Sequence, residues 1–331
     1  MDMKVFKFGG ASVNGAKGVR NVASIISRFP DDHIAMIISA MGKTTNALEE
    51  LLKFYMTDDA VLMVESFYRI KAFHFDILQE LFKKKNHPVF LEMEDLFEHL
   101  RGYLTRGQLT SGKKREYNFE YDQVVSYGEL LATAIVHHYL TLSGIQSRLF
   151  DARELIRTDS AYRDAKVDWT FTGKKIRSKM KAFFAANHSS RKVAVIQGFI
   201  GGDKEGNTTT LGREGSDYTA AIVAHSLKTK EVTIWKDVPG VMNADPKWFK
   251  HAKKLKVLSY REAIELAYYG ASVIHPKTIK PLENANITLR VRSFLKPELD
   301  GTTIEHLSEW KVLHPIYILK RNQVLILFWT K

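Results

Sequence analysis

Short apolar runs alternate with longer amphipathic segments along most of the chain. The runs at 3–8 and 33–40 predict strands, and the second is almost continuously apolar, as is typical of a strand buried on both faces. Further strands are expected at 147–151, 192–198, 231–235 and 287–292. Helices are expected at 15–28, 45–56, 60–84, 92–106, 121–142, 173–187, 216–227, 259–268 and 275–285. Strands and helices alternating in this way predict an α/β fold.

Two segments depart from this alternation. Residues 50–115 are poor in strand patterns and rich in helix formers, so we expect a helical insertion between sheet elements. After a turn at 297–301, the apolar strands within 314–331 have no later elements on which to pack. An unpaired edge of this kind favours aggregation. We therefore expect either that the chain ends inside a domain or that this segment pairs with a neighbouring subunit.

Composition narrows the class of protein. The 331 residues are 45% hydrophobic and 26% charged, which excludes disordered and collagen-like classes. The chain has no cysteine, which excludes disulfides and thiolate metal sites. The first residues lack the pattern of a secretory signal, and no apolar run approaches the roughly 18–20 residues of a membrane helix, so we expect a cytoplasmic protein without a membrane partner.

The charge balance is basic, with 49 Lys and Arg against 37 Asp and Glu, a formal net charge of +12. Such a surplus favours anionic partners, although a solvated basic surface explains it equally well. No nucleic-acid-reading motif accompanies the charge, so we expect no nucleic-acid partner. Phosphorylated small molecules remain as candidate ligands.

The first segment with candidate chemistry is Lys7-Phe8-Gly9-Gly10-Ala11-Ser12, between a strand and a helix. Glycines at such a junction allow backbone N–H groups to approach a phosphate, and the helix dipole favours negative charge there. Lys7 adds a point charge. A plain turn after a strand accounts for the same residues.

The second segment, 208–217, precedes an Ala-rich helix. Ser216 or Asp217 is expected to cap that helix, a structural role that accounts for both residues. Capping does not account for Arg213, because an arginine between glycine-rich turns is well placed to bind a carboxylate or phosphate through two parallel hydrogen bonds.

Two further segments are ambiguous alone. Residues 235–247 leave a strand as a turn-rich loop, in the position where open α/β sheets bind ligands, although a connecting loop has the same pattern. Residues 126–129 begin a helix with an acidic residue in its first turn, which the helix dipole also favours. His137 and His138 have no acidic neighbour at ligand spacing on their helix, so we expect packing or surface roles and no protein-held metal.

Together, the order of these motifs resembles the aspartokinases of the amino-acid kinase superfamily. The matching segments run from Lys7 to about Phe294, and 208–221 is the most specific. They are KFGGAS (7–12), SAMGKTTN (39–46), SYGE (126–129), QGFIG (197–201), TTTLGREGSDYTAA (208–221), WKDVPGVMNADPK (235–247) and YGASVIHPKT (269–278).

The resemblance implies an open αβα sandwich of the amino-acid kinase type with the helical insertion. It implies transfer of the ATP γ-phosphoryl group, with Mg²⁺ on the nucleotide, to the side-chain carboxylate of L-aspartate. The product is 4-phospho-L-aspartate, the first intermediate towards lysine, threonine and methionine. The implied catalytic domain is 1–295, with an amino-acid half to about residue 200 and a nucleotide half after it. Residues 296–331 then form a linker and the start of a truncated ACT-like segment, and a homodimer is expected.

Carried over position by position, the resemblance also implies site roles. Lys7 and Asp217 are expected to be catalytic. The nucleotide is expected to contact Lys7, Gly9, Gly10, Lys236, Asp237, Met242, Lys247 and Ser272. Aspartate is expected to contact Ser39, Ala40, Thr45, Glu129, Phe199, Arg213 and Ser216, with Glu129 on its ammonium group and Arg213 on its carboxylate.

Five positions depart from the usual family pattern. They are Glu214 at a common glycine, Lys236 at a common threonine, Met242 at a common tyrosine, Lys247 at a common arginine and Ser272 at a common lysine. Lys236 therefore offers a cation that Ser272 does not. The alternatives are a kinase for another amino-acid carboxylate, such as glutamate, and a non-catalytic fragment that binds an amino acid or a nucleotide.

Overall fold

The structure is a computed structural model. It describes residues 3–109, 115–185, 192–244, 249–268, 274–307, 316–320 and 323–327. The strands are β1 (Met3–Phe8), β2 (His33–Ile38), β3 (Ser147–Phe150), β4 (Val193–Gln197), β5 (Ile200–Gly202), β6 (Thr208–Thr210), β7 (Glu231–Lys236), β8 (Val257–Ser259), β9 (Thr288–Ser293), β10 (Thr302–Glu305), β11 (Ile316–Lys320) and β12 (Gln323–Leu327). The helices are α1 (Gly15–Ser27), α2 (Thr44–Met56), α3 (Ala60–Leu81), α4 (Pro88–Leu109), α5 (Tyr117–Val125), α6 (Tyr127–Leu142), α7 (Ala152–Leu155), α8 (Trp169–Ala185), α9 (Gly215–Leu227), α10 (Tyr260–Tyr268) and α11 (Pro276–Asn284).

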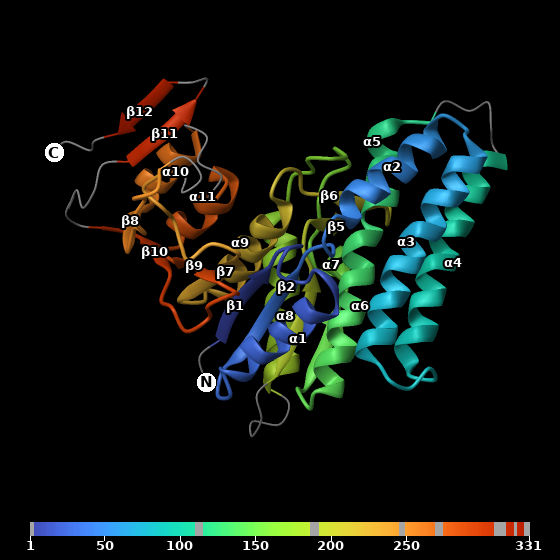
Figure 1. Cartoon of the computed structure of the whole chain (residues 1–331), viewed down its shortest axis with the longest axis horizontal. Helices are drawn as coiled ribbons and strands as arrows, with labels where there is room; N and C mark the ends of the chain where they lie inside the picture. The colour runs from blue at the N-terminus through green and yellow to red at the C-terminus, as the bar shows by residue number, and fades with distance from the viewer. Residues whose placement is uncertain are drawn as a thin grey trace.

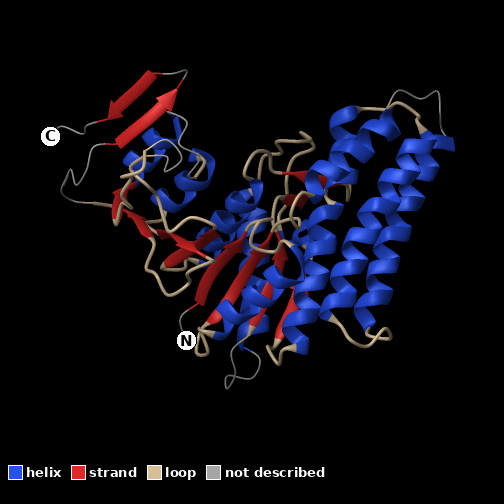
Figure 2. Cartoon of the chain, viewed as in Figure 1, coloured by secondary structure: helices blue, strands red, loops and turns tan. Residues whose placement is uncertain are grey.

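A single mixed sheet forms the centre of the fold (Figures 1 and 2). Within the described residues its strand order is β3-β4-β2-β1-β7-β9-β10-β8. The strands from β3 to β9 in this order are parallel to their neighbours, whereas β10 is antiparallel to β9 and parallel to β8. The α/β sandwich predicted from the sequence is confirmed.

The two faces of the sheet carry separate apolar clusters. Side chains alternate between faces along a strand. On β1, Phe6 and Phe8 therefore join the cluster that includes α1 and α6, while Val5 joins the one that includes α8, α9 and α11. Lys7, two residues after Val5, points to the α9 face. Every residue of β2 is buried, as expected for a strand covered on both faces.

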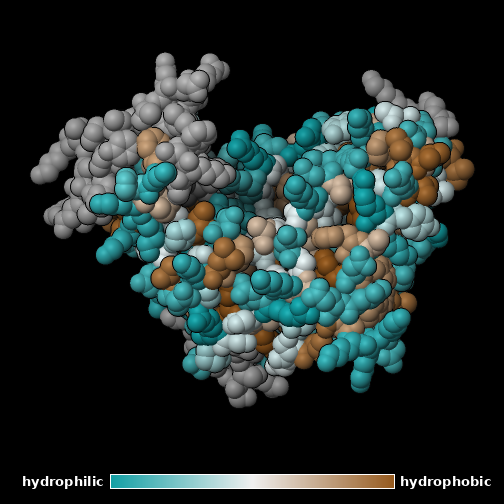
Figure 3. Space-filling model, viewed as in Figure 1, coloured by the Kyte–Doolittle hydropathy of each residue, from teal (hydrophilic) through white to brown (hydrophobic). Residues whose placement is uncertain are grey.

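The helical insertion is also confirmed. α3 and α4 are long helices that pack on each other, on α2 and on α6, beside the sheet (Figure 1). The side chain of Asp59 caps α3 by accepting a hydrogen bond from the Leu62 N–H at 3.1 Å. Apolar side chains of Val61, Val64 and Leu109 are exposed at the far end of this pair, which is apolar in Figure 3.

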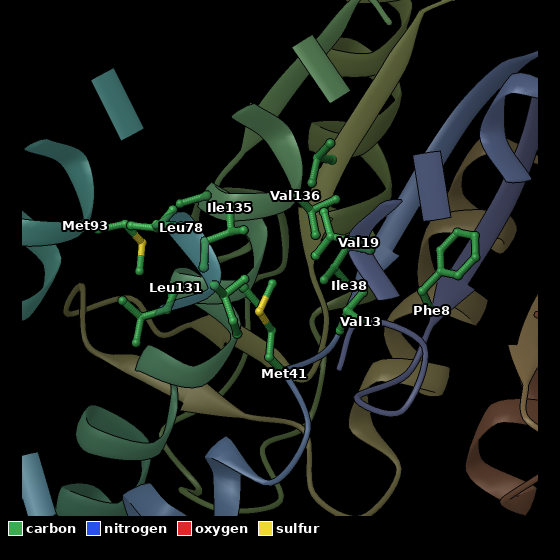
Figure 4. Close-up of a cluster of buried hydrophobic side chains, with 14 of the residues drawn as sticks. Phe8, Val13, Val19, Ile38, Met41, Leu78, Met93, Leu131, Ile135 and Val136 are labelled. Carbon is green, nitrogen blue, oxygen red and sulfur yellow. The ribbon is translucent and has the colours of Figure 1, made fainter. Parts of the chain in front are cut away.

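The core extends under the loops that follow β1 and β2. Val13 in the first loop and Met41 in the second are fully buried. Figure 4 shows them packed among side chains of the sheet and of α6, including Ile38 and Leu131. Burial of these apolar anchors fixes the two loops to the sheet, which stabilises the backbone above its carboxyl edge.

Three features differ from the sequence prediction. The helix expected over 121–142 is divided at Ser126 into α5 and α6. The short elements α7, β5, β6, β8 and β10 have too few residues for a clear periodic signal. β10, which follows residue 295, is a strand of the central sheet that the sequence pattern does not predict. β11 and β12 pair with each other as an antiparallel hairpin.

Candidate active site

The carboxyl ends of the adjacent parallel strands β4, β2, β1 and β7 surround a cavity of about 520 Å³. Lys7 is in register with Ile37 on one side and with Ile234 on the other. Ser39 and Lys236 lie two residues beyond those partners, so strand alternation places them on the same face as Lys7. The cavity brings together these predicted residues: Lys7, Ser39, Thr45, Glu129, Phe199, Arg213, Ser216, Asp217 and Lys236.

Lys7 and Asp217 form an ion pair inside this cavity. Asp217 lies in the first turn of α9, which packs on the face of β1 to which Lys7 points. The Lys7 Nζ lies 2.6 Å from Asp217 Oδ1, and the side chains are 12% and 3% exposed. A carboxylate in the first helical turn also interacts favourably with the helix dipole. The pair therefore holds the lysine ammonium at a defined point.

A second ammonium lies beside the same carboxylate. Lys236 is the last residue of β7, and its Nζ lies 4.0 Å from Asp217 Oδ2. Two lysines and one aspartate leave a net positive charge at this end of the cavity. Such an arrangement suits a phosphoryl group.

Glu129 lies on the opposite wall, in the first turn of α6, and is buried. Its Oε1 accepts a hydrogen bond from the Ala40 N–H at 3.1 Å. Its Oε2 has no hydrogen-bond partner among the described residues. Burial raises the pKa of the Glu129 carboxyl to about 8, against the smaller opposing effects of the Ala40 N–H and the Lys7 charge. An unpartnered oxygen at a cavity wall is suited to bind an ammonium group.

Glycines permit the close approach of the loops that form this wall. A Cβ on Gly128 would lie 2.8 Å from the Ala40 Cβ, so glycine allows the start of α6 to reach the Ala40 N–H. A Cβ on Gly10 would lie 2.8 Å from the Ala40 carbonyl oxygen. The Gly42 N–H donates to the Gly10 carbonyl at 3.0 Å, which joins the loops after β1 and β2.

The turn before α9 corrects the expected helix cap. Neither Ser216 nor Asp217 is the N-cap, because both lie within the helix. Glu214 is the N-cap residue and has left-handed backbone angles, with φ of 53°. Its carboxylate accepts the His275 N–H at 2.9 Å. The early start of the helix leaves Asp217 available for Lys7.

A comparison of the sequence with models of protein families identifies the family of this chain. The model of the amino acid kinase family matches residues 2–293. The chain belongs to the amino acid kinase family. The resemblance predicted from the motifs is thereby confirmed, and the cavity lies in a fold of known architecture.

Among amino acid kinases, the chain is similar to aspartokinases. It is 34% identical to "Aspartokinase 1, chloroplastic" of Arabidopsis thaliana, over 97% of this chain and 55% of that protein. It is 31% identical to the lysine-sensitive aspartokinase 3 of Escherichia coli, over 98% of this chain and 69% of that protein. The chain thus spans little more than half the length of the plant relative.

A solved structure supports the same similarity. The crystal structure of E. coli aspartokinase III in complex with aspartate and ADP superposes with a TM-score of 0.83 and 30% sequence identity. The match covers 95% of this chain and 66% of that chain.

Of the residues predicted to contact the nucleotide, only some line the cavity among the described residues. Lys7 and Lys236 line the cavity, and a Cβ on Gly9 would lie 3.1 Å from Lys7 Nζ. Neither Asp237 nor Met242 lines the cavity. Asp237 is exposed, and Met242 forms an isolated β-bridge with Lys254. Lys247 and Ser272 lie outside the described residues.

Sequence reasoning missed part of the cavity wall. Tyr121 of α5 and Arg163, between α7 and α8, both line the cavity. Asp122 lies directly behind them and is fully buried. These residues belong to none of the matching motifs, and α5 contains two acidic residues, Glu120 and Asp122, with no pattern that distinguishes Asp122.

His138 has an acidic partner on another helix. Glu92 of α4 lies 2.6 Å from the His138 Nε2. That contact lowers the pKa of Glu92. In the described part of the chain, no group of three or more His, Asp or Glu side chains is arranged to hold a metal ion, and no helix is long and apolar enough to cross a membrane.

Proposed function

We propose that this protein transfers the γ-phosphoryl group of ATP to the side-chain carboxylate of L-aspartate, giving 4-phospho-L-aspartate. The observation that carries the proposal is the polarity of the cavity. A Lys7–Asp217 pair with a second lysine lies at one end, and the unpartnered oxygen of Glu129 lies on the opposite wall. The similar E. coli enzyme was crystallised in complex with aspartate and ADP, which supports this choice of substrates.

The acceptor amino acid would lie between Glu129 and the glycine turn before α9. Glu129 Oε2 would accept from its ammonium group, and Arg213 would bind its α-carboxylate through two parallel hydrogen bonds. The side-chain carboxylate would then face Lys7. Four further residues would contact the acceptor: Ser39, Ala40, Thr45 and Ser216. Phe199, with φ of 69°, would close the wall between β4 and α9.

The donor phosphates would lie over the carboxyl end of β1. The residues there fit a nucleotide, because a Cβ on Gly9 would crowd Lys7 Nζ and a Cβ on Gly10 would meet the Ala40 carbonyl oxygen, so glycines let this turn pack closely beside the lysine at the start of a helix. Lys7 and Lys236 would contact the phosphates, and Asp237, Met242, Lys247 and Ser272 remain the other proposed nucleotide contacts. Mg²⁺ carried by the nucleotide would neutralise part of the phosphate charge.

For this reaction the protein would mainly position the two substrates and neutralise the charge on the phosphoryl group. A carboxylate acceptor is ionised at pH 7, so the reaction needs no general base. Lys7 would stabilise the charge on the phosphoryl group during transfer, and Asp217 would orient the Lys7 ammonium. Phosphoryl transfer depends mainly on such positioning and charge neutralisation.

A hydroxamate assay tests the proposal directly. Purified protein is incubated with ATP, Mg²⁺, hydroxylamine and either L-aspartate or L-glutamate, so that any acyl phosphate is trapped. Aspartate-dependent hydroxamate is the expected product. Glutamate-dependent product would transfer the proposal to another amino-acid carboxylate. No product from protein that still binds ATP would identify a non-catalytic fragment.

The organisation around this site is part of the proposal. Residues 1–295 would form the catalytic unit, with about 1–200 binding the amino acid and about 201–295 the nucleotide, and β10 completing its sheet. Residues 296–331 would supply the start of an ACT-like segment. A cytoplasmic homodimer is the expected state, which sedimentation and cell fractionation test.

A further inference from the structure

Arg163 is a cavity residue to which the proposed function gives no role. It lines the same cavity as Arg213 and is exposed at the rim, as Arg213 is. Its φ is 69°, in the left-handed region that favours glycine and that costs stability for other residues. Such conformations persist where surrounding structure enforces them, and they are concentrated at functional sites.

Asp122 enforces this conformation. Its side chain is fully buried on α5, and both carboxylate oxygens accept the Arg163 N–H, each at 3.1 Å. The Thr210 N–H and Oγ1 also donate to Asp122, both at 2.7 Å. Thr210 ends β6, three residues before Arg213. One buried carboxylate therefore fixes the backbone of Arg163 relative to the strand that leads to Arg213.

The turn that carries Arg163 and the turn that carries Arg213 are also in direct contact. A Cβ on Gly212 would lie 3.2 Å from the Arg163 carbonyl oxygen and 2.4 Å from Asp164 Oδ1. Glycine at 212, with φ of 76°, thus allows the turn carrying Arg163 to pack on the turn carrying Arg213. The geometry holds the two arginines at one edge of the cavity.

The Arg163 guanidinium is oriented by aromatic rings. It lies 4.5 Å from the centroid of the Tyr121 ring and 5.5 Å from that of Tyr117. Tyr121 is itself fixed, since its hydroxyl donates to Glu49 Oε1 at 2.8 Å. Among the described residues, no carboxylate forms an ion pair with this guanidinium. Its hydrogen-bonding edge is therefore available to a ligand.

We propose that Arg163 is a specificity-determining residue that binds the α-carboxylate of the acceptor amino acid together with Arg213. This inference rests on the proposed function, which assigns the side-chain carboxylate to Lys7 and the ammonium group to Glu129. The α-carboxylate is then the one remaining charge of aspartate, and it faces the arginine edge. An exposed arginine alone binds a carboxylate weakly in water, and a second guanidinium strengthens such binding.

The test uses Arg163→Gly with two acceptors that differ only at the α-carboxylate. Glycine is the residue best suited to φ of 69°, so this variant removes the guanidinium without adding backbone strain. The acceptors are L-aspartate and its α-amide, isoasparagine, which keeps the ammonium group and the side-chain carboxylate. KM for each, KM for ATP and the melting temperature are measured.

The proposal predicts a selective loss. KM for aspartate rises at least about tenfold, as expected for losing a charged hydrogen-bonding partner. KM for isoasparagine and KM for ATP stay within about twofold of the wild-type values, so preference for the free α-carboxylate falls by the same factor. Arg163→Lys keeps the charge without the planar fork and recovers only part of that preference.

Lys228→Gly is the matched control. Lys228 is also a cation with left-handed backbone angles, φ of 53°, but it lies at the other end of α9 from Asp217. This variant removes the same charge and relieves the same kind of strain, and we expect no change in either KM.

Two results would overturn the inference. One is that the KM values for aspartate and for isoasparagine both stay unchanged in Arg163→Gly, which leaves Arg163 a purely structural role. The other is an equal rise of both values, or a rise in KM for ATP, which assigns Arg163 to another part of the ligand set. If the wild-type protein makes no acyl phosphate, the proposed function fails by itself, and calorimetric Kd values for the same two acceptors then decide the role of Arg163.

Discussion

Lys7 Nζ lies 2.6 Å from Asp217 Oδ1, and this ion pair joins the end of the first strand to the first turn of α9. The pair depends on the face of β1 to which Lys7 points and on the crossing of α9 over that face. It fixes the position of the charge around which the proposed reaction is arranged, so its disruption gives the most direct prediction.

Replacing Lys7 with alanine is expected to lower kcat by at least about 100-fold, since a positioned charge acts mainly in the transition state. KM for aspartate is expected to stay within about threefold of the wild-type value. Steady-state kinetics measure both. Lys4→Ala is the matched control, because Lys4 lies on the same strand but pairs with Glu231 outside the cavity. Unchanged turnover in Lys7→Ala would remove Lys7 from its assigned role.

Replacing Arg213 with alanine is expected to act mainly on acceptor binding. Loss of a bidentate partner for a carboxylate corresponds to a rise of about tenfold or more in KM for aspartate. KM for ATP should not change. Arg148→Ala removes an exposed arginine of β3 that lies outside this cavity, and its kinetics should match those of the wild type. An unaltered KM for aspartate in Arg213→Ala would contradict the assignment.

The raised pKa of Glu129, about 8, predicts that aspartate binding depends on pH. Below that pH the free protein holds Glu129 neutral, whereas binding an ammonium group favours the carboxylate, so binding releases a proton. KM for aspartate is therefore expected to fall as the pH rises from about 6 towards 8, by up to about tenfold per unit. Calorimetry in buffers of different ionisation enthalpy measures the released proton. A flat profile would be the contrary result.

The raised pKa of the Glu129 carboxyl also predicts how the free energy of unfolding changes with pH. Its folded-state pKa lies above the unfolded value of 4.5, so between these limits the folded state holds a proton that the unfolded state releases. The Glu129 contribution to the free energy of unfolding therefore falls as the pH rises from about 4.5 to 8, by about 1.4 kcal/mol per pH unit at most. Glu129→Gln stays neutral, so the variant gains stability relative to the wild type across this window. Urea unfolding at about pH 5 and about pH 8 measures the difference, and a constant difference would refute it.

Two substitutions of Glu214 distinguish the effect of backbone strain on stability from the effect of a lost hydrogen bond. It has φ of 53° and accepts the His275 N–H. Glu214→Ala loses that acceptor and keeps the strain, whereas Glu214→Gly loses the acceptor and relieves the strain. The glycine variant is expected to be more stable than the alanine variant by about 1 kcal/mol in urea unfolding. Lys228→Gly and Lys228→Ala, at a second left-handed position, should differ by a similar amount. Equal stabilities of the two Glu214 variants would show that the turn carries no strain.

The long strands and helices, and most of the residues that line the cavity, could be predicted from the sequence and its motifs. The buried strands and long helices have strong periodic patterns, and the motifs after β1, β2 and β7 mark the positions where parallel strands end. Those ends meet at one edge of a sheet, so Lys7, Ser39 and Lys236 could be expected together.

The remaining features depend on contacts that form only in the folded chain. Sequence favoured Ser216 or Asp217 as the cap of α9, but the left-handed turn at Glu214 starts the helix earlier and turns Asp217 towards Lys7. Arg163 belongs to none of the matching motifs, and it reaches the cavity because buried Asp122 binds both its backbone and Thr210. Contacts between segments distant in sequence leave no periodic pattern, since they depend on how helices cross the sheet and on which buried polar groups find partners.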